Sequence, residues 1–221
     1  REFTMTAALV ARGMLEDEFG LRSQDMRWCY GRADATDDVP IARVLPRDVE
    51  IEKIGDDETL SDLLAEGRID AMIAYKPPKA YVVGVPHVRR LFEDYPPLER
   101  DYYRRSGHFP IMHLIGVRRE TLARDPGLAV RLCDAFQLAL DYSQARLIET
   151  QASYTMLPWN AAEVARLKAD FGALWRYGFK DNLEAIRTLC RYSLAQGIAA
   201  RAVEPEELFA PETIDWMAQP A

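Results

Sequence analysis

The sequence predicts an α/β fold, and three observations lead to this prediction. In the first half, short apolar or alternating runs are separated by helical patterns, which is typical of a parallel sheet whose strands are joined by helices. In the second half, long stretches repeat apolar residues at three- and four-residue spacing, as helices with one buried face do. The length of 221 residues allows one large domain or two smaller lobes with cores of their own.

The first half is expected to alternate between the two kinds of element. We expect strands at 26–30 (MRWCY), 49–54 (VEIEKI), 69–75 (IDAMIAY) and 88–92 (VRRLF), and helices at 4–19, 59–67, 77–84 and 96–107. The run at 69–75 is apolar and bounded by turn signals, as a buried parallel strand would be. Thr59 is expected to cap the second helix, and Gly20, Gly67 and Gly107 are expected to follow the ends of helices.

The second half is expected to begin with one more strand and then to become helical. The run FPIMHLIGVRR (109–119) has the apolar composition of a strand, and helices follow at roughly 128–149, 161–171 and 181–196, the last with Asp181 as its N-cap. One face of the first of these helices is expected to be core. Its residues are Leu128, Leu132, Ala135, Phe136, Ala139 and Leu140.

Composition excludes some classes of function. The 28 basic residues against 35 acidic ones give a net charge of −7, which argues against nucleic acid as a partner, because phosphate binding needs a basic face. No apolar run approaches the roughly 20 residues that span a bilayer. Three scattered cysteines and three scattered histidines form no metal or redox motif, and unpaired cysteines favour the cytoplasm. The chain opens with REFTMT, so we expect that an upstream part is missing.

The segment RRSGHFPIMH (104–113) gathers two arginines and two histidines before the apolar run at 111–117. One interpretation is an ordinary helix end, where Arg104 and Arg105 compensate the helix dipole and Gly107 adopts the left-handed conformation. The other interpretation is a binding site for an anionic ligand. These residues alone leave both open.

Longer stretches of the sequence resemble the 4,5-dihydroxyphthalate decarboxylase family. The resemblance lies in TMTAALVARGMLEDEFG, TLSDLLAEGRIDAMIAYKPP, VRRLFEDY, YYRRSGHFPIMHLIGVRRETL and RYSLAQGIAARAVEPEELFAPET, of which YYRRSGHFPIMH is the most specific. It implies a type 2 periplasmic-binding-protein-like fold with two lobes around a cleft, here without the N-terminal part of one lobe. Residues 1–105 would form an inserted α/β lobe, and 106–221 a returning hinge strand and the helical remainder of the other lobe.

The resemblance also implies an activity. The family converts 4,5-dihydroxyphthalate to protocatechuate and carbon dioxide, a chemistry that needs no metal or organic cofactor in principle. It does need a clamp for a carboxylate, a general acid and a hydrogen bond or base at the phenol. The expected partner is a small aromatic carboxylate, and a homo-oligomer is left open. The rival prediction is a solute-binding protein of an ABC-type transporter, which would clamp a small organic anion without chemistry.

Eight residues are candidates for this site. Histidine titrates nearest neutrality, so His113 and His108 are the candidates for proton transfer, although His113 could be a hydrogen-bonded core residue and His108 could be exposed. Arginine can hold a carboxylate with two hydrogen bonds, but Arg104 and Arg105 diverge by about 100° on a helix, so one at most faces the ligand. Thr4 and Thr6 either bind an anion at a helix N-terminus or cap that helix. Tyr30 and Tyr75 stand at the ends of expected strands.

Overall fold

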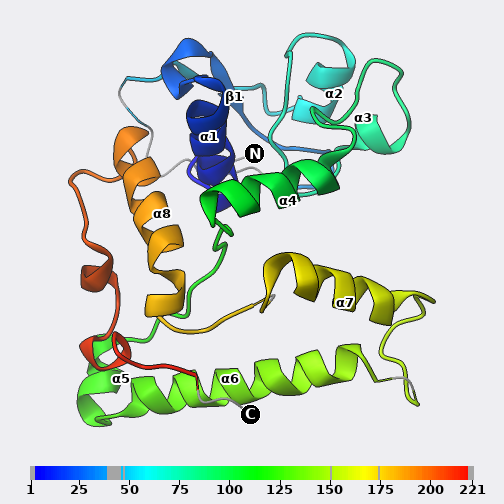
Figure 1. The fold of residues 1–221 in the computed structure, drawn as a ribbon. Coiled ribbons are helices and arrows are strands. Elements are labelled where there is room, and N and C mark those ends of the chain that lie inside the picture. Colours follow the sequence, from blue (N-terminus) through cyan, green and yellow to red (C-terminus); the bar gives the residue numbers. More distant parts are fainter. Residues whose placement is uncertain (1–2, 39–45, 47, 150, 174, 219–221) are drawn as a thin grey trace. The chain divides into compact units, whose positions relative to one another are not determined.

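The structure is a computed structural model and describes residues 3–38, 46, 48–149, 151–173 and 175–218 (Figure 1). Its helices and strands are α1 (Thr6–Phe19), η1 (Ser23–Asp25), β1 (Trp28–Tyr30), β2 (Ile51–Lys53), α2 (Leu60–Ala65), α3 (Lys79–Val82), α4 (Tyr95–Ser106), α5 (Arg119–Arg124), α6 (Leu128–Leu147), α7 (Asn160–Phe171), η2 (Lys180–Asn182), α8 (Leu183–Ala195), η3 (Pro205–Leu208) and η4 (Pro211–Thr213), where η denotes a 3-10 helix. The expected mixture of helices with parallel strands is therefore present, with a small sheet.

The chain divides into two compact units. The first unit comprises Arg1–Tyr95 and Thr188–Val203, and the second comprises Pro96–Arg187 and Glu204–Ala221. Helix α8 begins in the second unit and ends in the first.

The sheet of the first unit consists of two parallel strands. β1 pairs with β2 so that Trp28 faces Ile51 and Tyr30 faces Lys53, which confirms both predicted strands and their direction. The strands predicted at 69–75 and 88–92 are wrong, because neither segment forms a strand. An apolar run becomes a strand only where a neighbour pairs with its backbone N–H and C=O groups. Tyr75 and Leu91 are instead 50% and 77% exposed.

The helix ends of the first unit follow from single residues. The Thr59 hydroxyl accepts a hydrogen bond from the Asp62 N–H at 3.1 Å, so the predicted cap of α2 is confirmed. Gly20 and Gly67 follow α1 and α2 with φ of 68° and 70°, a left-handed conformation that glycine adopts without steric cost. Helix α1 begins at Thr6 rather than at Thr4.

One part of the core of the first unit lies where α1 meets the C-terminal part of α8. Gly13 allows this contact, because a Cβ at this position would stand 2.4 Å from the ring of Tyr192. The buried Tyr192 donates its hydroxyl to Asp17 at 2.6 Å, and Arg191 also bonds that carboxylate. Two segments far apart in the sequence are thus joined by a close aromatic contact and a polar one.

The second unit is mainly helical, as predicted. Helices α4, α6, α7 and α8 all lie within two residues of their expected ranges, and Gly107 follows α4 with φ of 64°. Asp181 is not an N-cap; it lies inside η2, which the buried Phe179 precedes. The expected core face of α6 is only partly right. Ala129 is the buried side chain of this helix, whereas Ala135 and Ala139 are exposed.

The strand predicted at 109–119 is wrong. Residues 107–118 carry no helix or strand, and within them Leu114 and Ile115 are 57% and 55% exposed. The composition suits a strand, but no described residue supplies the pairing ladder. Among the described helices, none is both long and apolar enough to cross a membrane.

Candidate functional site

The turn after α4 holds His108 in a defined orientation. Gly107 ends the helix with φ of 64°, and after it the His108 N–H donates a hydrogen bond to the Ser106 hydroxyl at 3.1 Å. The Tyr102 hydroxyl and His108 Nδ1 form a hydrogen bond of 2.7 Å, and the two rings meet edge to face. His108 is 7% exposed. The alternative that His108 is merely exposed is therefore wrong. The sequence did not reveal that Tyr102, six residues earlier, would cover its ring.

An aromatic cluster lies beside this turn and joins α4 to α7. Tyr103 meets Phe171 at 4.9 Å between ring centres, and Phe109 meets Phe171 at 6.0 Å and Trp175 at 5.2 Å. All three contacts are edge to face, an arrangement that aromatic rings prefer. The cluster fixes the position of Phe109 immediately after His108.

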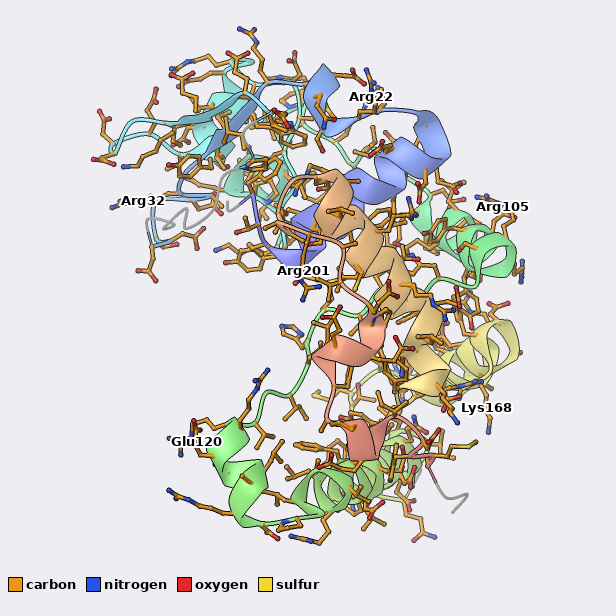
Figure 2. All side chains as sticks on the ribbon, turned by 90° about the vertical axis from the view of Figure 1, so that its left-hand side faces the viewer. Arg22, Arg32, Arg105, Glu120, Lys168 and Arg201 are labelled. Atoms are coloured by element: carbon orange, nitrogen blue, oxygen red, sulfur yellow. The ribbon has the colours of Figure 1, made fainter. Side chains whose placement is uncertain are left out.

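The two arginines of the segment point to different partners. Arg104 bonds the Asp170 carboxylate of α7 at 2.8 Å, and Arg100 approaches the same carboxylate at 3.6 Å. Arg105 bonds Asp101 on its own helix at 2.9 Å, and its side chain extends outward from α4 (Figure 2). The predicted divergence of neighbouring helical residues is confirmed. In this structure both guanidinium groups are bound to carboxylates of the chain itself.

His113 lies in the extended segment between α4 and α5. Its side chain is exposed, and no hydrogen bond joins it to another described residue. It is therefore neither embedded in a strand nor a hydrogen-bonded core histidine. The third histidine, His87, is also exposed and hydrogen bonds the carbonyl of Ala65.

Thr4 and Thr6 lie at the N-terminus of α1, in the first unit. Met5 is the N-cap residue, and no side chain caps the helix, so ordinary capping by either threonine is wrong. Both threonines are half-buried, and neither hydroxyl hydrogen bonds another described residue. The first N–H groups of a helix have no partner within it and favour an anion.

Arg12 anchors this helix start, and sequence patterns alone did not single it out. The Arg12 side chain is 1% exposed, donates to the Phe3 carbonyl and to Gln196 Oε1 at 2.8 Å each, and lies 3.6 Å from the centre of the Phe3 ring. Burial lowers the pKa of Arg12 to about 10. A charged residue four positions after Ala8, on the apolar face of the helix, was the signal that could have revealed it.

The two candidate tyrosines have different surroundings. Tyr30 ends β1 and is half-buried. Tyr75 is 50% exposed, and the Lys76 ammonium group lies 5.8 Å from the centre of its ring. Lys76 pairs with Asp37 at 2.8 Å, and this hydrogen bond raises the pKa of the lysine.

The eight candidates divide equally between the units. Thr4, Thr6, Tyr30 and Tyr75 belong to the first unit, and Arg104, Arg105, His108 and His113 belong to the second. Within the second unit, the two arginines lie in the last turn of α4 and His108 follows just after it, but each of the three side chains bonds a different residue. Across the described ranges, no three His, Cys, Asp or Glu side chains are grouped to hold a metal ion. Cys29, Cys133 and Cys190 are free thiols.

The chain is similar to known proteins of one family. No family model matches the chain. A 4,5-dihydroxyphthalate decarboxylase from Comamonas testosteroni is 32% identical over 216 residues, which cover 97% of this chain and 66% of that protein. A 4,5-dihydroxyphthalate decarboxylase from Pseudomonas putida is 36% identical over 104 residues, which cover 47% of this chain and 40% of that protein. The chain thus spans just under two thirds of the length of the first relative, and it belongs to the 4,5-dihydroxyphthalate decarboxylase family.

Proposed function

We propose that the protein decarboxylates 4,5-dihydroxyphthalate, or a closely related aromatic dicarboxylate, to protocatechuate and carbon dioxide. The observation that carries the proposal is the similarity over 97% of the chain to a protein of that name. The buried and oriented His108 adds a chemical reason, because the reaction requires a proton donor held in place.

The proposed reaction begins with the phenol para to the leaving carboxylate. Ionisation of that hydroxyl pushes electron density into the ring, and a general acid protonates the ring carbon that bears the carboxylate. The bond between the ring and the carboxylate then breaks, its electron pair restores the aromatic ring, and carbon dioxide leaves. One proton thus replaces one carboxyl group, and no electrons are gained or lost.

The proton donor in this proposal is one of two histidines. His108 has an imidazole whose Nδ1 is held by Tyr102, and Nε2 is the nitrogen that would serve the substrate. His113 is five residues further along and is exposed, so it can meet a ligand directly. The structural observations favour His108, because a fixed ring loses less orientational freedom in the transition state.

Two groups of residues are proposed to hold the anionic substrate. The N-terminus of α1, with Thr4 and Thr6, would bind one carboxylate through backbone N–H groups and hydroxyls. Arg104 or Arg105 would bind the other, and each would exchange its present aspartate for the substrate. Tyr30 and Tyr75 would contact the ring or its hydroxyl groups.

The proposal includes a fold and a location. We infer the type 2 periplasmic-binding-protein-like arrangement of two lobes around a cleft, supported by the division into two units and by the parallel pair β1 and β2. A cytoplasmic location is supported by the three free cysteines.

The experiment compares binding with turnover in the same preparation. Calorimetry measures binding of 4,5-dihydroxyphthalate, and trapping of carbon dioxide together with chromatography of protocatechuate measures the reaction. The proposal expects binding and equal amounts of the two products. Binding without carbon dioxide would favour a solute-binding protein, and the absence of both would refute a role with this substrate.

A further inference from the structure

One face of α6 carries an apolar stripe that the rest of the described chain leaves open. The stripe consists of Ala135, Leu138, Tyr142 and Ala145, all exposed, and the two large side chains are 70% and 61% exposed. The residues follow one another at spacings of three, four and three, so at about 100° per residue they lie in one line along the helix.

The stripe is the outward face of a helix whose opposite face is already used. On that opposite face Ala129 is buried and Phe136 packs on Tyr177 at 6.0 Å between ring centres. Helices α7 and η4 contact α6 within the same unit, and Figure 1 draws α7 beside it. A surface helix normally carries polar residues on its outward face. A second apolar line is characteristic of an interaction surface.

The charges at the two ends of the stripe are opposite. Arg131 lies on the same line, one turn before Ala135, and Glu149 follows two residues after the end of α6. A second copy of the helix, turned antiparallel by a two-fold axis at Leu140, would place Leu138 against Tyr142, Ala135 against Ala145 and Arg131 against Glu149. Such a self-complementary surface is what a two-fold symmetric interface requires.

We propose that this stripe docks a second copy of the same chain through antiparallel α6 helices. One helix pair alone is small beside the roughly 800 Å² that each partner usually buries. The Arg146 guanidinium lies 5.9 Å from the centre of the Tyr142 ring and 4.7 Å from that of the Tyr154 ring, so the exposed Tyr154 extends the apolar surface beyond the stripe. Arg131 bonds Asp125 within the chain, and its several N–H donors also allow a bond to a partner glutamate.

The first test is sedimentation velocity of the 221-residue chain over a series of concentrations. The proposal expects a reversible dimer, and Leu138→Glu should weaken dimerisation by at least about 30-fold, as loss of a central contact does. Leu91→Glu is the matched control, because Leu91 is similarly exposed but belongs to the first unit. A chain that is monomeric throughout, or two variants that behave alike, would overturn the proposal.

The second test exchanges charges and does not depend on the fold of the Leu138 variant. Arg131→Glu and Glu149→Arg should each weaken the dimer, since each places like charges together at both ends of the stripe. Mixing these two proteins should restore dimers, because every contact in the mixed pair is then between opposite charges or between side chains left unchanged. A mixture that dimerises no better than its components would exclude the antiparallel register and with it this docking surface.

Discussion

The two units bury their apolar side chains to very different extents. Among the described residues, ten buried hydrophobic side chains belong to the first unit, and three, Ala129, Phe179 and Ile186, belong to the second. The first unit also encloses a polar network around Arg12, whereas most ion pairs of the second unit are exposed. Similar local patterns of apolar residues therefore lead to a core only where another segment of the chain covers them.

The largest effect is expected from removing the buried arginine of the first unit. Arg12→Ala should lower the free energy of unfolding by about 3 kcal/mol, because it leaves a cavity and deprives Gln196 and the Phe3 carbonyl of their donor. Urea unfolding at neutral pH measures the change. Arg22→Ala is the control, since Arg22 is exposed (Figure 2), and it should change stability little. Equal effects of the two substitutions would contradict the contrast between core and surface.

The second effect concerns the buried histidine of the second unit. Tyr102→Phe should cost about 1–2 kcal/mol of unfolding free energy, because His108 Nδ1 loses its hydrogen bond while the ring remains buried. Tyr103→Phe offers a matched control in the adjacent position, where the ring packs on Phe171 and the hydroxyl bonds no described residue. Thermal or chemical denaturation of both variants provides the comparison. If Tyr103→Phe lowers the free energy of unfolding more than Tyr102→Phe does, the aromatic cluster rather than the histidine turn stabilises this unit.

The third effect tests the link between α4 and α7. Asp170→Asn weakens the bonds to Arg104 and Arg100 and should cost about 1 kcal/mol, the upper range for ion pairs that solvent reaches. Asp101→Asn, which affects the exposed pair with Arg105, should cost about 0.3–0.5 kcal/mol. A double-mutant cycle of Asp170 with Arg104 isolates the pair. A coupling energy near zero would mean that aromatic packing alone joins the two helices.

The smallest expected effect is a difference between the two units in the alkylation rates of their cysteines. Burial raises the pKa of the Cys29 thiol in the first unit and of the Cys133 thiol in the second. Both should therefore be alkylated by iodoacetamide more slowly in the native protein than in guanidinium, because the thiolate is the reactive form. Cys133 should react sooner than Cys29, because its unit has the smaller core. Peptide mass spectrometry measures both rates, and faster labelling of Cys29 would reverse the comparison.

Sequence signals within a few residues predicted the helices well. They failed for several strands, because a strand depends on pairing with a segment that is distant in the sequence. Thr59, Gly20 and Gly107 set the ends of their helices through bonds and angles within a few residues, so the sequence alone located them. The runs at 69–75, 88–92 and 109–119 have the composition of strands, but a strand also needs a partner from elsewhere in the chain. MRWCY and VEIEKI formed strands because each supplies the ladder of the other.

The candidate site residues show the same contrast between local signals and distant contacts. The divergence of Arg104 and Arg105 follows from helix geometry and was predictable, whereas their partners Asp170 and Asp101 were not assigned. The burial of His108 depends on Tyr102, six residues earlier, and the anchoring of α1 depends on Gln196, far away in the sequence. Residue types indicated which side chains could do chemistry, and the three-dimensional contacts indicated which of them are held in place.

The most direct test of the proposed decarboxylase is the turnover of three histidine variants with 4,5-dihydroxyphthalate. His108→Gln should lower kcat by roughly 10²–10⁴-fold, the usual contribution of a general acid, while calorimetry shows binding nearly unchanged. His87→Gln, at an exposed position of the first unit, should retain wild-type turnover. A selective loss in His113→Gln would transfer the role of proton donor to His113. Normal release of carbon dioxide by all three folded variants would contradict proton transfer by histidine and therefore the proposed mechanism.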